Sequence, residues 1–161
     1  MIIREYKSED REAVEKCIFE LQEEEYKLNP DYWTTPEEAT PKYLAYLLPK
    51  IEKKEGRLYV AEVDGAVKGF IAVVVNNDTY EDNGPCIKLR KSLYVTDLII
   101  LKSDQKRGIG WELLKVVEEY GRKIGIEYIG LHVSKGNSAL EFYRKNDYLE
   151  RHISMDKKLN E

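Results

Sequence analysis

Stretches in which apolar residues alternate with polar ones, or run together, recur along the chain, and such patterns predict β-strands. Six stretches show this: residues 2–6, 57–63, 66–75, 92–101, 127–133 and 148–159. Asp64-Gly65 joins the second and third. Asp-Gly between two strands favours a hairpin, because its turn needs positive φ angles. The pattern predicts six strands with one tight hairpin, and the last stretch could form one strand or a pair.

Four other segments carry apolar residues three or four positions apart, which is helical spacing. The first helix is expected after residue 10 and should fade near Asn29-Pro30. The second begins near Thr35-Pro36, where proline suits the first helical turn. The third follows Gly108, and the fourth covers 137–145.

These elements follow one another in the order β-α-α-β-β-β-α-β-α-β. A hairpin in the first half and β-α-β crossovers in the second predict an α/β (α+β) fold, with a mixed central sheet and helices on both faces. The chain shows no internal repeat, linker or low-complexity tract. Residues 1–161 are therefore predicted to form a single domain.

Composition and charge narrow the classes of function. The 161 residues are 42% apolar and 35% charged, which is typical of a soluble globular protein. Even the apolar run FIAVVV at 70–75 is far too short to span a bilayer, so no membrane partner is expected. A net charge of −4 argues against nucleic acid as a partner and is compatible with a cationic small molecule or peptide. The acidic run Glu23-Glu24-Glu25 could equally face water, as helical Glu runs usually do.

The two cysteines also bear on location and on metal binding. Cys17 and Cys86 lie far apart and lack metal-ligand spacing, so free thiols are expected and no metal site. Free thiols are typical of a reducing compartment. The first residues show no basic segment followed by an apolar leader. The expected location is the cytoplasm.

The stretch DLIILKSDQKRGIGWELL, Asp97 to Leu114, holds the main candidate chemistry. A strand-like run passes through a basic loop with Gly108 and Gly110 into an amphipathic helix. The first amides of a helix lack internal acceptors, and glycines let an anion approach them. These features favour a diphosphate ligand. A Walker loop would need Gly-Lys-Ser/Thr, and a dinucleotide fingerprint would need a third glycine where Leu113 stands.

Two motifs together resemble one family. Gln-x-x-Gly-x-Gly after the strand DLIIL, followed by a Leu-Leu helix, resembles the acetyl-CoA loop of the GNAT superfamily of N-acetyltransferases. Downstream, Ala139-x-x-x-Tyr143-x-Lys145-x-x-Tyr148 resembles that family's usual Ala-x-x-x-Tyr-x-Lys-x-Gly-Phe. The hairpin VDGAVKGFIAV resembles the family's second and third strands. The resemblance covers nearly the whole chain, and the family's fold has the element order predicted above.

The resemblance implies roles for specific residues. The pyrophosphate would bind backbone amides of seven consecutive residues: Gln105, Lys106, Arg107, Gly108, Ile109, Gly110 and Trp111. The pantetheine arm would pair with the backbone of Leu98, Ile99 and Ile100, and an amide there would receive the thioester oxygen. Tyr143 would protonate the departing thiolate. A tyrosine of pKa about 10 can donate to a thiolate of pKa about 8.5 at modest cost.

Three positions depart from the family pattern, and one of them is Lys102, which stands where many members carry Pro. The family places Asn seven residues before the tyrosine, where this chain has Gly136, and Asn137 follows one residue later. Asn137 is therefore either a cofactor contact or a cap of the following helix. Asp147 replaces the usual glycine before the last aromatic residue, a change that left-handed backbone geometry tolerates.

The sequence leaves the general base open. His132 lies on the strand where some family members place a catalytic Glu, and histidine accepts a proton near neutral pH. Asp97 could instead hold the substrate ammonium or relay a proton through water. Each could also be an ordinary strand residue. The candidate catalytic residues are thus Tyr143, His132 and Asp97.

Taken together, the resemblance implies an enzyme: an acetyl-CoA-dependent N-acetyltransferase whose acceptor amine attacks the thioester directly. The acceptor would be a small, aminoglycoside- or polyamine-like amine or a peptide. An alternative is a catalytically idle acetyl-CoA sensor or interaction module, and a third hypothesis is binding of another phosphate ligand. A homodimer through sheet edges or the C-terminal strand is compatible with the sequence.

Overall fold

The computed structural model of the chain describes residues 1–79, 84–86 and 88–159. Its centre is a five-stranded sheet with the spatial order β1-β2-β3-β4-β5. The strands are β1 (Ile2–Glu5), β2 (Arg57–Val63), β3 (Ala66–Asn77), β4 (Lys91–Ile100) and β5 (Tyr128–Leu131). The first four pair antiparallel, whereas β4 and β5 pair parallel. The sheet is mixed, as predicted.

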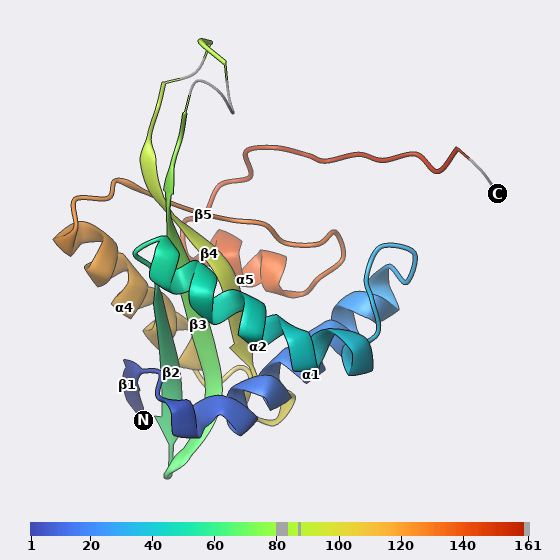
Figure 1. Ribbon diagram of the computed structural model, residues 1–161, viewed down its shortest axis with the longest axis vertical. Helices are drawn as coiled ribbons and strands as arrows, with labels where there is room; N and C mark the ends of the chain where they lie inside the picture. The colour runs from blue at the N-terminus through green and yellow to red at the C-terminus, as the bar shows by residue number, and fades with distance from the viewer. Residues whose placement is uncertain (80–83, 87, 160–161) are drawn as a thin grey trace.

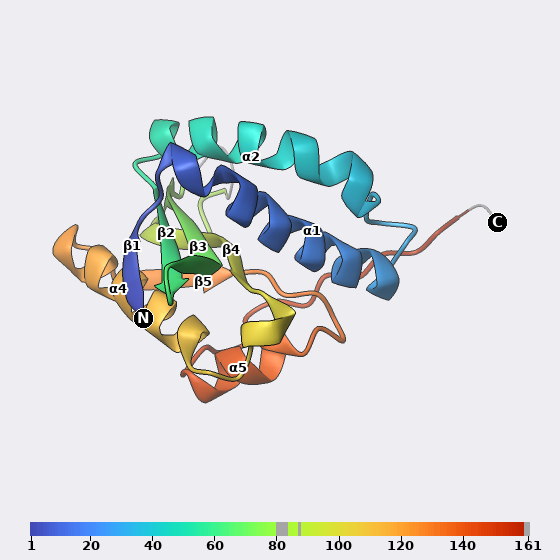
Figure 2. The same ribbon diagram turned by 90° about the horizontal axis from the view of Figure 1, so that it is seen from below.

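Helices cover both faces of this sheet (Figure 2). The long helices α1 (Arg11–Leu28) and α2 (Pro36–Lys53) lie side by side on one face. The helix α4 (Ile109–Lys123) and the short α5 (Ala139–Lys145) lie on the other. Two 3-10 turns, η1 (Ser8–Asp10) and η2 (Lys102–Asp104), precede α1 and follow β4. The predicted order is confirmed from the first strand to the last helix.

The central strand β3 separates two apolar cores. Phe70, Ala72 and Val74 pack toward α1 and α2. The residues between them, such as Ile71 and Val73, pack toward α4. A strand buried on both faces needs apolar residues at successive positions. This explains why FIAVVV is a continuous apolar run.

β4 contains one extra residue relative to β3. Ala72 pairs with Asp97, but the next residue, Val73, pairs with Val95. Thr96 therefore forms a β-bulge, and its hydroxyl donates to the Ala72 carbonyl at 3.1 Å.

The bulge reverses which residues of β4 face each layer. Before it, Leu93 and Val95 pack into the core on the α4 side. Beyond it, Leu98 and Ile100 do so, whereas Ile99 packs toward α1 and α2. Odd-numbered residues thus face α4 before the bulge and the opposite layer after it.

The hairpin predicted at Asp64-Gly65 is confirmed: both residues have positive φ, 52° and 77°. The strand predicted over 66–75 continues into the polar loop that follows it in the sequence. Asn76 and Asn77 pair with Ser92 and Lys91 and so extend β3. Pairing with β4 outweighs the weak strand preference of Asn. Residues 80–83 of that loop lie outside the described residues.

The prediction of a strand over 148–159 is wrong. These residues have no regular secondary structure, and the segment runs away from the sheet (Figure 1). Four of its apolar side chains, those of Leu149, Ile153, Met155 and Leu159, are 84–91% exposed. A strand needs a neighbouring edge to take its backbone hydrogen bonds. In the described part of the chain, the backbone of this segment beyond Tyr148 forms none.

Candidate active site

The loop between β4 and α4 has the backbone geometry of an anion site. Lys106 and Gly108 adopt left-handed φ angles of 61° and 81°, and α4 begins at the next residue, Ile109. No side chain caps this helix. Within the described residues, the backbone N–H groups of residues 106–111 donate to no acceptor. The row of free N–H groups at the positive end of the α4 dipole favours a bound anion.

Side chains hold this loop in place. Arg107 donates to the buried carboxylate of Asp104 at 2.6 Å, and Lys68 lies 3.9 Å from the same group. A hydrogen bond from Ser103, together with these cations, holds the pKa of Asp104 below its usual value. Gln105 folds back and donates from Nε2 to the Ile100 carbonyl at 3.2 Å. The amides of 106–111 therefore stay without acceptors in the described structure, while ion pairs and hydrogen bonds of the side chains hold the loop.

β4 and the edge strand β5 separate partway along β4. β5 pairs only with Ser92–Val95 of β4, and its last residue, Leu131, lies opposite Val95. Beyond the bulge, Leu98–Ile100 still pair with β3 but have no strand on their other side. In the described structure no second strand covers the edge predicted to receive the pantetheine arm, and of its carbonyls that of Ile100 accepts the Gln105 side chain.

Asp97 lies at this parting point and is only 6% exposed. The Tyr43 hydroxyl, from α2, donates to both of its carboxylate oxygens at 3.0 and 2.9 Å. Burial raises the pKa of Asp97 to about 6, and hydrogen bonds from Tyr43 and Thr96 oppose that rise. The carboxyl group thus titrates much nearer neutrality than an ordinary aspartate.

Tyr143, on α5, is 8% exposed and packs against the rings of Phe142 and Tyr148. Burial is the main cause that raises its pKa, and Tyr148 and Asp97 add to the rise. The phenol therefore stays protonated throughout the neutral range. Its hydroxyl makes no hydrogen bond within the described residues.

His132 follows the last residue of β5 and is exposed, so it lies where the two strands part. Its Nδ1 is 2.8 Å from the Tyr94 hydroxyl of β4. When Nδ1 carries the proton and donates it to Tyr94, Nε2 is free to accept one. Burial and Asp97 both raise the pKa of Tyr94, which places that phenol within electrostatic reach of the buried carboxyl.

Asn137 is held at both ends of its side chain. Its Oδ1 accepts the backbone N–H of Ala139 at 2.8 Å, so it caps the start of α5. Its Nδ2 donates to the carboxylate of Glu25 at 2.8 Å. Of the two readings left open by the sequence, the capping contact is the one present, and a cofactor contact remains a prediction.

Of the predicted catalytic residues, Asp97 and His132 lie where β4 and β5 separate, and Tyr143 lies on α5. Tyr143 and Tyr94 lie within the electrostatic reach of Asp97, and His132 is bonded to Tyr94. The sequence pointed to Glu25 only as part of the acidic run 23–25, and it singled out none of Tyr43, Tyr94 and Ser134 as site residues. Strict alternation along β4 would place Tyr94 and Asp97 on opposite faces of the sheet. The local pattern therefore could not show that the bulge brings them to the same face.

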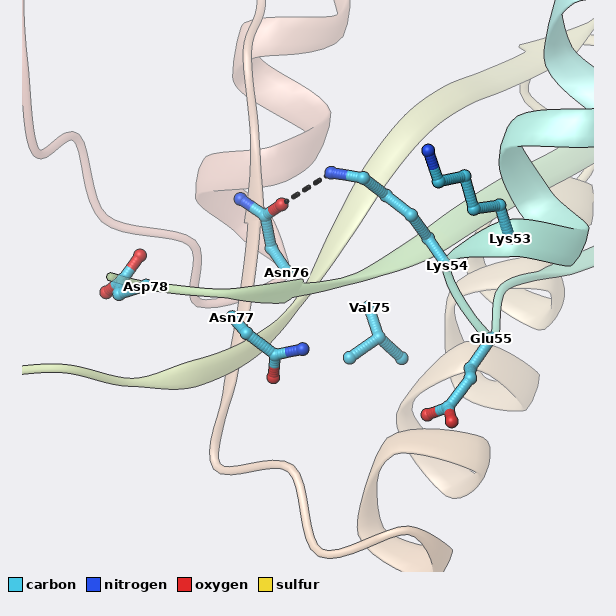
Figure 3. A pocket seen from close by; sticks show the side chains of 7 residues that line it. All are labelled: Lys53, Lys54, Glu55, Val75, Asn76, Asn77 and Asp78. Carbon is cyan, nitrogen blue, oxygen red and sulfur yellow. Dashed lines mark hydrogen bonds between the residues drawn. The ribbon is translucent and has the colours of Figure 1, made fainter. Parts of the chain in front are cut away.

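A separate open cavity of about 520 Å³ lies where α2 ends beside the end of β3 (Figure 3). It is lined by Lys53, Lys54, Glu55, Val75, Asn76, Asn77 and Asp78. The Lys54 ammonium donates across it to Asn76 Oδ1 at 3.3 Å. None of the predicted site residues lines it.

Among residues 1–79, 84–86 and 88–159, no three His, Cys, Asp or Glu side chains are grouped so that they could hold a metal ion. None of the described helices combines the length and apolar character that crossing a membrane requires.

The acetyltransferase (GNAT) family model matches residues 17–148 of the chain. This match includes the free-amide loop, the open edge of β4 and Tyr143. No curated protein matches the chain by sequence.

Solved structures with the same fold include three of different origin. A mutant of the BH1408 protein from Bacillus halodurans is 20% identical, with a TM-score of 0.89 over 99% of this chain and 100% of that one. A GCN5-related N-acetyltransferase from Ralstonia eutropha is 20% identical, with a TM-score of 0.72 over 98% and 97%. An aminoglycoside acetyltransferase from an uncultured soil metagenomic sample is 18% identical, with a TM-score of 0.63 over 99% and 96%. At such identities the likeness establishes the fold alone.

Proposed function

The chain belongs to the GNAT family of acetyltransferases, and on that premise we propose that it transfers the acetyl group of acetyl-CoA to a primary amine. Family membership makes it an acyltransferase, and acetyl-CoA is the donor that the family uses. The observation that carries the proposal is the row of free N–H groups at 106–111, immediately after the unpaired edge of β4. A strand edge followed along the chain by an anion site suits a ligand in which an extended arm is joined to a diphosphate.

In this proposal the pyrophosphate binds the amides of Gln105–Trp111. The amide-containing arm of the donor pairs with Leu98–Ile100 as an added strand. An N–H group of that edge then donates to the thioester oxygen and stabilises the negative charge that develops on it. Orientation of the two reactants is the largest contribution such a cleft can make, up to roughly 7–11 kcal/mol.

Tyr143 is proposed as the proton donor. The neutral amine nitrogen attacks the thioester carbon, and the carbon–sulfur bond breaks as the tetrahedral intermediate collapses. The Tyr143 hydroxyl gives its proton to the departing thiolate. Its raised pKa keeps it protonated for this step but makes full transfer harder. The same dry surroundings also raise the pKa of the thiol, which offsets part of that cost.

His132 is proposed as the base because it is exposed at the opening, with Nε2 available when Nδ1–H bonds to Tyr94. It would take the proton that the attacking nitrogen loses. Asp97 is nearly sealed beneath Tyr43, so its proposed role is to attract the ammonium form of the acceptor. A cationic acceptor, polyamine- or aminoglycoside-like, is supported by this carboxyl and by the net charge of −4.

We also propose a cytoplasmic location, supported by the free thiols of Cys17 and Cys86. A homodimer is proposed because β5 forms one edge of the sheet, and because the segment after Tyr148 exposes four apolar side chains and its backbone makes no hydrogen bond in the described structure. The C-terminal segment of each copy would pair as a strand with β5 of the other copy. Because both copies contribute the same two elements, this exchange forms a closed two-fold dimer.

The test is thiol release from acetyl-CoA across a panel of amines that includes polyamines, aminoglycosides and peptides. Tyr143→Phe should lower kcat by about 10²–10⁴-fold with an accepted amine. Tyr148→Phe is the matched control, because its ring lies 5.5 Å from that of Tyr143 on the same segment. Coenzyme A binding without turnover on any amine would favour the sensor. Stabilisation by ATP or NAD in place of coenzyme A would favour another phosphate ligand; a ligand at 100 times its Kd adds about 2.7 kcal/mol.

A further inference from the structure

Glu25 is a buried carboxylate near the end of α1. It is 7% exposed and forms no ion pair within the described residues. Its partners are neutral donors from the loop between β5 and α5: Asn137 Nδ2 at 2.8 Å and the Ser134 hydroxyl. Burying a charged carboxylate is costly unless its lone pairs are satisfied. This contact therefore joins α1, which covers one face of the sheet, to the segment that leads to α5 on the other.

The connection continues into α5. The side chain that donates to Glu25 also accepts the N–H of Ala139, the first residue of α5. Tyr143 lies four residues later, one helical turn away. Two hydrogen bonds thus lead from the α1 carboxylate, through Asn137, to the helix that carries the proposed proton donor. Gly136 lies beside the end of α1, because a Cβ added there would lie 3.7 Å from the Leu28 side chain.

The Tyr143 hydroxyl has little else to hold it. It makes no hydrogen bond within the described residues, and its ring contacts Phe142 and Tyr148, which belong to the same segment. α5 is also held by Phe142 and Tyr148, which pack against the core on the α4 side, with the Phe142 ring close to Gly110 in the first turn of α4. The position of the hydroxyl therefore follows the position of α5.

We propose that Glu25 is a positioning residue for acetyl transfer, which acts through Asn137 to fix α5 and with it the Tyr143 hydroxyl. This inference rests on the proposed function of Tyr143. A shift of about 1 Å in a reacting group can lower a rate by about 100-fold, so a carboxylate that touches no reactant can still control turnover.

The first test is a double-mutant cycle on kcat. Glu25→Ala should lower kcat by about 10–100-fold while the KM for acetyl-CoA changes by less than about threefold. In a Tyr143→Phe background the same change should lower kcat by less than about twofold, because the group being positioned is gone. A general structural role would give the same loss in both backgrounds, and that result overturns the proposal. Glu12→Gln, at an exposed position on the same helix α1, should leave kcat unchanged.

An exchange of partners guards against simple misfolding. Asn137→Asp alone sets two carboxylates against each other and should lower kcat as Glu25→Ala does. Adding Glu25→Gln restores a carboxylate–amide pair in reverse, and a carboxylate at position 137 can still accept the Ala139 N–H. The double variant should recover kcat to within about threefold of the parent. Failure to recover, in a protein that unfolds at the parent's temperature, contradicts the proposal.

Hydrogen–deuterium exchange separates this inference from the proposed function. Glu25→Ala should speed exchange of the amides at 139–147, whether or not any amine is acetylated. Unchanged exchange there refutes the positioning role even in an active enzyme. If exchange is faster but the parent protein turns over no amine, the contact between Glu25 and Asn137 does hold α5, and the proposed acetyl transfer is what the result refutes.

Discussion

The burial of Asp97 predicts how the free energy of unfolding depends on pH, because a carboxyl group that loses water on folding changes its pKa. Burial raises its pKa from 3.8 to about 6, although Tyr43, Thr96 and Lys50 pull it downward. The informative change is Asp97→Asn, which keeps the size of the side chain and an acceptor for the Tyr43 hydroxyl but cannot ionise.

The sign follows from proton binding. The folded chain keeps the Asp97 proton up to about pH 6, whereas the unfolded chain releases it near pH 3.8, so the folded state binds more protons between these values. The free energy of unfolding therefore falls as pH rises through this window. A shift of about two pKa units corresponds to about 3 kcal/mol in all. Between about pH 4.5 and about pH 7.5, integration of the linkage relation leaves about 2 kcal/mol.

The assay is urea unfolding of both proteins across this pH range, followed by fluorescence of Trp33 and Trp111. The variant should gain about 2 kcal/mol over the parent as pH rises from about 4.5 to about 7.5. Other titrating groups are common to both proteins and cancel in the difference. A difference constant to within about 0.5 kcal/mol would show that Asp97 titrates as an exposed aspartate, and the reasoning from burial would be refuted.

Four further predictions each rest on one local feature of the structure. The buried Tyr148 hydroxyl has no hydrogen-bond partner in the described structure, so Tyr148→Phe should raise the free energy of unfolding in urea by about 1 kcal/mol. Gly108 has a φ of 81°, so Gly108→Ala should cost about 1–2 kcal/mol and weaken coenzyme A binding measured by calorimetry. Asp10 accepts hydrogen bonds from Arg4 at 2.7 and 2.8 Å that lower its pKa. Asp10→Asn should therefore cost about 2 kcal/mol near neutrality, and this loss should vanish as pH falls through the lowered pKa; a pH-independent loss would contradict the linkage. Ending the chain at Tyr148 should convert the proposed dimer to a monomer in light scattering, and an unchanged mass would exclude strand exchange.

Much of the fold could be predicted because its signals are local. The Asp64-Gly65 turn, the helical spacing of α1, α2 and α4, and the apolar run of β3 each depend on residues close in sequence. The same holds for the loop at 105–111, where the two glycines and the start of a helix indicated free amides. These segments form because local preference and burial agree.

The predicted C-terminal strand shows where local signals fail. Residues 149–159 have strand-like alternation, but a strand also needs a neighbouring edge, and alternation does not encode one. Asn76 and Asn77 show the converse. Their side chains favour a loop, yet pairing with β4 makes them strand.

The sequence by itself determined the order of elements, the hairpin and the anion loop, because each depends on backbone geometry within a few residues. Tertiary structure alone decided which side chains meet. The bulge at Thr96 turns Asp97 away from α4, toward Tyr43 on α2, and Glu25 reaches Asn137 across 112 positions of sequence. Such contacts depend on how twisted layers pack and where strands separate, and neither property is written in the periodicity of one segment.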